Sequence, residues 1–273
     1  MCLILFAYRC HPRYELVLAA NRDEYYDRAT APLGVWDDAP DILAGRDLQE
    51  GGTWLGITRG GRFAAITNYR DPTDFKPGAP SRGKLVSDYL RGGEPAEAYL
   101  ARLRPFADAY NGFNLLLGEA GSLHYFSNRS GRPPEALKPG VYGLSNHLLD
   151  TPWPKLARGR EALRDLIIAE GGFTQTDLMR LLGDRAPAPE SEVPRTGLTL
   201  EWEIRLSPTF IAAPEYGTRS STVLLVDEYR RVYISEQNWI NFSYCEYRLL
   251  WPAIGDPPRT TTRTGSVADE RAG

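Results

Sequence analysis

The stretch that decides the fold is residues 2–24, CLILFAYRCHPRYELVLAANRDE. Two apolar runs, residues 2–8 and 15–20, flank a short polar turn around Pro12. Apolar strands joined by a turn of this kind form a β-hairpin. The sequence therefore predicts that the protein begins with two paired strands.

Strand and helix patterns continue in groups along the chain. Further strands are expected at residues 53–58, 62–68, 113–118, 123–127, 141–145, 220–226, 231–236 and 242–249. Apolar residues at helical spacing occur in residues 84–91, 95–103, 154–170 and 174–182, and the last segment opens with the capping pattern Thr-Gln-Thr-Asp. Residues 25–50 lack periodicity and predict a long surface loop, as do residues 186–198. Antiparallel strands separated by helix pairs indicate an α+β layered protein, with two sheets and helices outside them.

The composition is that of a globular protein without an anionic polymer as partner. The chain has 273 residues, 42% of them hydrophobic, which is enough to bury a full core in one domain. We expect this domain to span residues 1–254, followed by a flexible polar tail at residues 255–273. A net charge of -3 provides no basic excess for nucleic acid. No apolar run approaches the roughly 20 residues that cross a bilayer.

Cysteine and histidine usage predicts neither a disulfide framework nor a metal site. Cys2, Cys10 and Cys245 show no zinc-site spacing, and the three histidines show no metal-ligand spacing. Three cysteines in a chain of this length favour a reducing cytoplasm. The apolar run at the N-terminus breaks off after Tyr8 and carries neither a basic segment before it nor a cleavage site after it, so we interpret it as a strand and not as a signal peptide.

Cys2 has one property that no internal cysteine shares. Its small side chain permits removal of Met1, which leaves a free α-amine on the same residue as the thiol. That amine has a pKa of about 8, so it can accept the proton of the thiol and act as a built-in base. The alternative is that Cys2 is a small apolar residue at the start of a buried strand, and position alone favours this packing role.

Several sequence blocks carry a resemblance to a known family. They are MCLI, AANRDE, GGTWLGI, AAITNYRDP, SRGKLV, YNGFNLLLG, YGLSNHLLDTPWPK and YGTRSSTVLLVD. Through them the chain resembles the NRDE family of transport and Golgi organisation proteins. That family is in turn distantly similar to the choloylglycine hydrolase and penicillin V acylase group of N-terminal-nucleophile (Ntn) hydrolases. The resemblance implies a four-layer αββα sandwich of two mainly antiparallel sheets flanked by helices.

The resemblance also implies roles for particular residues. Cys2 would be the nucleophile, and Asp23 would hold its amine. Asn68 and Asn146 match the two asparagines that stabilise the oxyanion, where amide donors are needed. Arg219 matches an arginine near the nucleophile, where a cation lowers the pKa of a thiol. From the residues alone, an ordinary turn or surface role remains an alternative for each of these four partners.

The chain departs from the hydrolase pattern at one position. Hydrolases of that group carry an arginine three residues before the aspartate, where this chain has Ala20. Arg22 is the nearest substitute, although neighbouring strand residues face opposite sides of a sheet. The residues expected to contact a substrate are Arg22, Trp54, Tyr69 and His147.

Two functions of different classes follow from the resemblance. The first is an Ntn-type cysteine amidohydrolase that acts on a small amide or acylated substrate after loss of Met1 and requires no cofactor. The second is a non-catalytic protein that binds or traffics haem, acyl-coenzyme A or lipid in the same pocket, because family members have been linked to haem trafficking and lipid metabolism. Both readings make a small molecule the expected partner.

Overall fold

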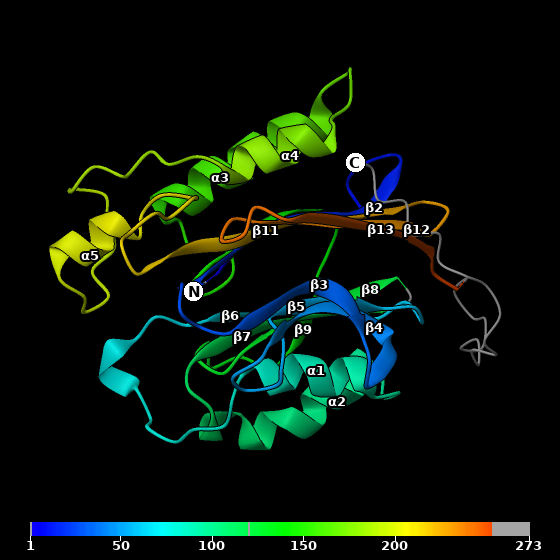
Figure 1. The fold of residues 1–273 in the computed structure, drawn as a ribbon, viewed down its shortest axis with the longest axis horizontal. Coiled ribbons are helices and arrows are strands. Elements are labelled where there is room, and N and C mark those ends of the chain that lie inside the picture. The colour runs from blue at the N-terminus through cyan, green and yellow to red at the C-terminus, as the bar shows by residue number, and fades with distance from the viewer. Residues whose placement is uncertain (1, 120, 253–273) are drawn as a thin grey trace.

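The computed structural model describes residues 2–119 and 121–252, and these form four layers. Figure 1 shows two sheets stacked face to face, with helices covering the outer face of each. Each sheet buries one face against the other sheet and the opposite face against helices. This arrangement confirms the αββα sandwich that the sequence predicts.

The first sheet is built around the N-terminal hairpin. Its strands are β1 (Cys2–Tyr8), β2 (Tyr14–Tyr25), β10 (Gly140–Leu144), β11 (Tyr216–Asp227), β12 (Arg231–Asn238) and β13 (Tyr244–Leu250). Their order is β10-β1-β2-β11-β12-β13, and every neighbouring pair is antiparallel. The predicted hairpin is confirmed, with Cys2 opposite Arg22 at one end and Tyr8 opposite Leu16 at the other.

The second sheet has seven strands, also all antiparallel. They are β3 (Thr30–Trp36), β4 (Ala39–Asp47), β5 (Leu55–Thr58), β6 (Phe63–Asn68), β7 (Phe113–Glu119), β8 (Ser122–Ser127) and β9 (Glu135–Ala136). They pair in chain order from β3 to β9. The strands expected at residues 53–58, 62–68, 113–118 and 123–127 are confirmed as β5, β6, β7 and β8.

Helix pairs cover the outer faces of the two sheets. Helices α1 (Gly83–Arg91) and α2 (Ala96–Leu103) pack on the seven-stranded sheet, and α3 (Pro154–Ile168) and α4 (Gln175–Leu182) pack on the six-stranded sheet. Helix α4 begins at the predicted cap, where Thr174 and Asp177 each bond the backbone of the other. The remaining elements are α5 (Leu200–Arg205) and the short 3-10 helices Pro72–Asp74 and Arg104–Ala109. Within the described residues, no helix combines the length and apolar character needed to span a membrane.

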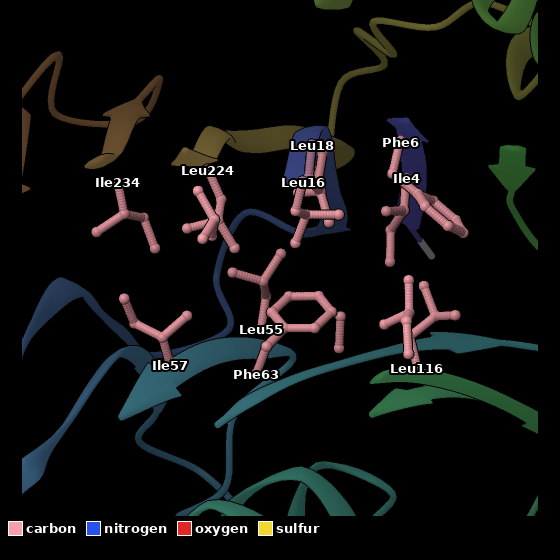
Figure 2. Close-up of a cluster of buried hydrophobic side chains, with 14 of the residues drawn as sticks. Ile4, Phe6, Leu16, Leu18, Leu55, Ile57, Phe63, Leu116, Leu224 and Ile234 are labelled. Atoms are coloured by element: carbon pink, nitrogen blue, oxygen red, sulfur yellow. The ribbon is translucent and has the colours of Figure 1, made fainter. Parts of the chain in front are cut away.

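The largest buried cluster lies between the sheets. Figure 2 shows Ile4, Phe6 and Leu18 reaching from the six-stranded sheet toward Leu55 and Phe63 of the other sheet. Burial of a side chain of this size stabilises the fold by about 1.5–3 kcal/mol. Since side chains alternate along a strand, the even-numbered residues of β1 face this inter-sheet core and the odd-numbered ones face α3 and α4. Cys2 therefore belongs to the inter-sheet face.

The prediction of a long loop at residues 25–50 is wrong, because β3 and β4 occupy most of this segment. Strand β3 is the edge of its sheet and buries only Leu33 and Trp36 fully, so it lacks a continuous apolar pattern. Pro32 is tolerated there because an edge strand leaves one row of backbone groups unpaired. Strand β9 and helix α5 were also not predicted, because both are too short to show a periodic pattern in the sequence. The loop at residues 186–198 is confirmed, and the tail predicted at residues 255–273 lies outside the described residues.

Candidate active site

Cys2 lies at one end of the inter-sheet space, where a cavity of about 340 Å³ opens. The thiol-bearing residue is buried, with 9% of its surface exposed, and it lines the cavity beside Arg22 from β2. The seven-stranded sheet supplies Trp54 and Asn68 to the same lining. Both sheets thus contribute to one cavity, whose size lies within the range of small-molecule sites.

Arg22 is the cation nearest to the thiol in the strand register. It stands directly opposite Cys2, so both side chains share the inter-sheet face. Its guanidinium lies 4.3 Å from the centre of the Trp54 ring, a cation–π contact that orients it within the cavity. Burial raises the pKa of the Cys2 thiol, and the Arg22 charge acts in the opposite direction.

Asp23 is adjacent to Cys2 but belongs to the other face of the sheet. Its carboxylate accepts a hydrogen bond from Thr218 Oγ1 at 2.7 Å, and its backbone oxygen accepts one from Tyr216 Oη at 3.0 Å. Burial raises the pKa of the Asp23 carboxyl, and the nearby charge of Lys155 is the strongest effect that lowers it. Asp23 also lines the cavity, so it reaches the neighbourhood of the Cys2 backbone from behind the sheet.

A buried group of charges surrounds Asp23 on its helix side. Lys155, in the first turn of α3, is 2% exposed and donates to the backbone oxygen of Leu206 at 3.0 Å. Burial lowers the pKa of Lys155 to about 8, while Asp23 opposes that shift. Nearby, Arg70 and Glu203 form a buried ion pair at 2.7 Å. None of these three charged residues was singled out from the sequence.

The two predicted asparagines occupy different positions. Asn68 ends β6 and lines the cavity. Asn146 is fully buried and donates its Nδ2 to the backbone oxygen of Asn68 at 3.0 Å. Its neighbour Ser145 donates to the backbone oxygen of Cys2 at 3.2 Å. The segment around Asn146 therefore ties the end of β6 to the start of β1, and Asn146 is not among the described residues that line the cavity.

Arg219 and the pair formed by Tyr69 and His147 lie apart from the cavity lining in the described structure. Arg219 Nη1 donates to the backbone oxygens of Tyr25 and Tyr26, both at 2.6 Å, from a bulged position of β11. Tyr69 Oη and His147 Nε2 are 2.7 Å apart and hydrogen-bond each other. The structure brings Cys2, Arg22, Asp23, Trp54 and Asn68 together, and it places the other four predicted residues around them.

Asn21 precedes Arg22 and Asp23 in the Asn-Arg-Asp-Glu stretch, and its side chain joins three segments of the fold by hydrogen bonds. It donates Nδ2 to the backbone oxygens of Leu182 and Thr209, both at 2.9 Å, and accepts from Ser221 Oγ at 2.6 Å. These bonds connect the end of α4 and the loop before β11 to β2. Asp23 lies two residues further along β2, on the same face of the sheet as Asn21.

Arg82 is a further cavity residue that the sequence analysis did not single out. It stands immediately before α1 and donates Nη1 to the backbone oxygen of Gly112 at 2.9 Å. The SRGKLV block contained it, and Lys155 ends the block YGLSNHLLDTPWPK, so membership of a family block was the available signal for both. The described residues contain no group of three His, Cys, Asp or Glu side chains that would hold a metal ion.

Comparison with known proteins identifies the family. A family model described as Transport and Golgi organisation 2 matches residues 1–241. The chain belongs to this family. Its relatives include the Transport and Golgi organization protein 2 homologs of Bos taurus and Homo sapiens, which are 36% and 34% identical over 88% of this chain and 94% of their own length. The Transport and Golgi organization protein 2 of Drosophila melanogaster is 30% identical over 87% of this chain and 92% of its own length. The family predicted from the sequence blocks is confirmed.

Comparison with solved structures finds two proteins of low similarity. One is a Caenorhabditis elegans ortholog of N-acylethanolamine-hydrolyzing acid amidase, with a TM-score of 0.46, 10% identity, and coverage of 82% of this chain and 92% of that protein. The other is a mutant conjugated bile acid hydrolase from Clostridium perfringens, with a TM-score of 0.45, 9% identity, and coverage of 90% and 92%.

Proposed function

We propose that the protein is an Ntn-type cysteine amidohydrolase that acts on a small amide or acylated substrate after Met1 is removed. The observation that carries the proposal is the position of Cys2, which lines a cavity of about 340 Å³ at the very start of β1. A buried, fixed strand end is where an α-amine and a thiol on one residue can act on a bound substrate. Arg22 on the cavity side and Asp23 behind the sheet provide the charges that this chemistry requires.

In the proposed reaction, the Cys2 amine takes the thiol proton while Sγ bonds to the amide carbonyl carbon. Asn68 donates to the oxyanion that forms, and Asp23 stabilises the protonated amine. The carbon–nitrogen bond then breaks as the ammonium gives its proton to the leaving amine, which leaves a thioester on Cys2. Water attacks this thioester after losing a proton to the amine. The carbon–sulfur bond breaks, the carboxylic acid departs, and the thiolate recovers the proton.

A second candidate is binding without turnover, with haem, acyl-coenzyme A or lipid as ligand. The observation that favours it is the buried environment of Cys2, which raises the pKa of the thiol and so disfavours the nucleophilic thiolate. Ala20, where related hydrolases carry an arginine, points the same way. In this case Cys2 would only pack the cavity wall.

The test begins with the intact mass of the purified protein, which we expect to lack Met1. The protein is then incubated with a panel of acylated amides, quenched in acid, and digested to look for an acyl adduct on the Cys2 peptide. We expect an adduct and free amine with the parent and with Cys10→Ala, a matched exposed cysteine, and neither with Cys2→Ala. Retention of Met1 would rule out the hydrolase. If no amide is cleaved and Cys2→Ala binds haem or acyl-coenzyme A as tightly as the parent, the binding role holds.

A further inference from the structure

Arg82 differs from the other arginines of the cavity in its partners. Arg28 pairs with Asp47 at 2.6 Å and lies 3.8 Å from Glu24, and Arg22 lies 4.0 Å from Glu24. Within residues 2–119 and 121–252, Arg82 forms no ion pair within 4.0 Å, and its one hydrogen bond to protein is the neutral backbone oxygen of Gly112. A guanidinium has five N–H donors, so Arg82, which lines the cavity, keeps donors that no hydrogen bond to the described protein residues uses.

The carboxylates of the cavity are engaged or directed elsewhere. Four of them line it, Asp23, Glu24, Asp47 and Glu50. Asp47 and Glu24 are held by the arginines of β2 and its following turn, and Asp23 faces Thr218 and Lys155. Glu50 is exposed at the rim. The cavity therefore contains a positive charge at Arg82 that the described protein groups do not neutralise at contact distance.

Arg82 also lies within electrostatic range of the nucleophile. Burial lowers the pKa of Arg82, and the charge of Glu24, followed by a negative charge on Cys2, acts in the opposite direction. The guanidinium is partly buried, and the bond to Gly112 anchors it between the start of α1 and the start of β7. An anchored, partly desolvated arginine that lines the same cavity as the Cys2 thiol is suited to bind an anionic oxygen group with good geometry.

We propose that Arg82 forms an anion-binding subsite, and that the substrate cleaved at Cys2 carries a carboxylate or phosphate group close to its scissile amide. The statement about the substrate rests on the proposed function, because it assumes that Cys2 cleaves an amide. The anion-binding subsite does not depend on that function and requires only the cavity. A neutral amide fills the same space without satisfying the guanidinium. An anionic one gains charge-assisted hydrogen bonds in a site largely screened from water.

Two alkylating probes of equal shape test this without a known substrate. Iodoacetate carries a carboxylate and iodoacetamide does not, and both transfer their methylene carbon to the Cys2 sulfur with loss of iodide. The rate at Cys2 is followed by mass spectrometry of its peptide, and the iodoacetate-to-iodoacetamide ratio is compared with that of free cysteine. We expect the parent ratio to exceed the free-cysteine ratio, and Arg82→Met to lower it about tenfold, the effect of losing one charge-assisted bond.

Two further variants sharpen the experiment. Arg102→Met removes an exposed arginine of α2 whose partner is Glu94, and we expect it to keep the parent ratio. Arg82→Lys retains the charge but loses the planar fork, and we expect an intermediate ratio. If Arg82→Met fails to fold, two other measurements test the proposal. They are the ratio in Arg82→Lys and the loss, at high salt, of the parent's preference for iodoacetate over iodoacetamide. A parent ratio equal to that of free cysteine, or one unchanged in Arg82→Met, would overturn the proposal.

Protection experiments distinguish the two anions. Acetate and inorganic phosphate are each tested for slowing the reaction of Cys2 with iodoacetamide in the parent and in Arg82→Met. Protection by acetate alone indicates a carboxylate substrate, protection by phosphate indicates a phosphorylated one, and protection by neither contradicts the subsite. Retention of Met1 together with a high iodoacetate ratio would reject the hydrolase and keep the anion subsite, so the two proposals fail separately.

Discussion

Cys2 and Arg22 stand directly opposite each other in the β1–β2 pair, and both side chains line the same cavity. Ala20 is opposite Ile4, one step further along the same face, within the apolar core. An arginine at position 20 would have pointed into the same inter-sheet space. The register thus places a cation, Arg22, on the same side of the sheet as Cys2, although residue 20 is apolar.

Arg22→Met is expected to make the Cys2 thiol harder to ionise, because Arg22 is a positive charge that lowers its pKa against the effect of burial. The rate of Cys2 alkylation by iodoacetamide should fall several-fold at about pH 8, and its pH profile should move to higher pH. Arg219→Met is the matched control, since Arg219 donates to the backbone oxygens of Tyr25 and Tyr26. A shift with Arg219→Met and none with Arg22→Met would return the thiol-activating role to Arg219.

The buried Arg70–Glu203 pair should dominate the stability of the region behind Asp23. Glu203→Leu leaves the Arg70 charge buried without its partner at 2.7 Å, so the free energy of unfolding should drop by about 3–5 kcal/mol. Replacing both, with Arg70→Met and Glu203→Leu together, should restore most of the loss. Urea unfolding monitored by tryptophan fluorescence measures these differences.

The exposed pair Arg102–Glu94 provides the comparison for that measurement. Its atoms are 2.8 Å apart, but its side chains are 62% and 33% exposed, so Glu94→Ala should cost less than about 1 kcal/mol. Equal losses for Glu94→Ala and Glu203→Leu would show that the buried pair contributes no more than a surface one.

The elements that could be predicted are those whose hydrophobic pattern is visible within a short stretch of sequence. The β1–β2 hairpin is apolar on both faces, because one face meets the other sheet and the other meets α3, so its runs are continuous. Strands β3 and β4 are interrupted by Pro, Gly and Asp residues and are only partly buried. Their strand character comes from pairing with each other and with β5, which is a tertiary effect.

The residues of the candidate site also fall into those that a local motif identifies and those that only the tertiary structure brings near. Asp23 and Asn68 were identifiable because each belongs to a recognisable motif, Asp23 near the end of β2 and Asn68 at the end of β6. Arg82 and Lys155 approach Cys2 and Asp23 only because α1 and α3 pack on opposite sheets, and no local pattern encodes that approach. The direction of Arg219 depends on a break in register between Thr218 and Ser220. A bulge of this kind re-aims a side chain without leaving a periodicity in the sequence.

His147 should make the protein less stable in mild acid. Burial lowers its pKa from about 6.5, so the unfolded chain takes up this proton at a higher pH than the folded one. Its contribution is complete above about pH 6.5 and is lost as the pH falls toward the folded pKa. Between about pH 7.5 and pH 5.5 the loss should stay below about 1.4 kcal/mol, the value of one pKa unit. Urea unfolding of His147→Gln should show a smaller decrease over this range than the parent, and an identical decrease would assign the effect to other groups.

Gly45→Ala should disturb the cavity from beneath Trp54. A Cβ at position 45 would lie 2.2 Å from the Trp54 ring, and real Cβ contacts are never that short, so the indole must shift and its contact with Arg22 must change. Overpacking of this kind costs about 1–3 kcal/mol, and the displaced ring should change tryptophan fluorescence and slow Cys2 alkylation by iodoacetamide. Gly93→Ala is the matched control, because a Cβ there meets nothing within 4 Å. If Gly45→Ala kept the parent's stability and alkylation rate, Trp54 would not be what holds Arg22 beside the thiol.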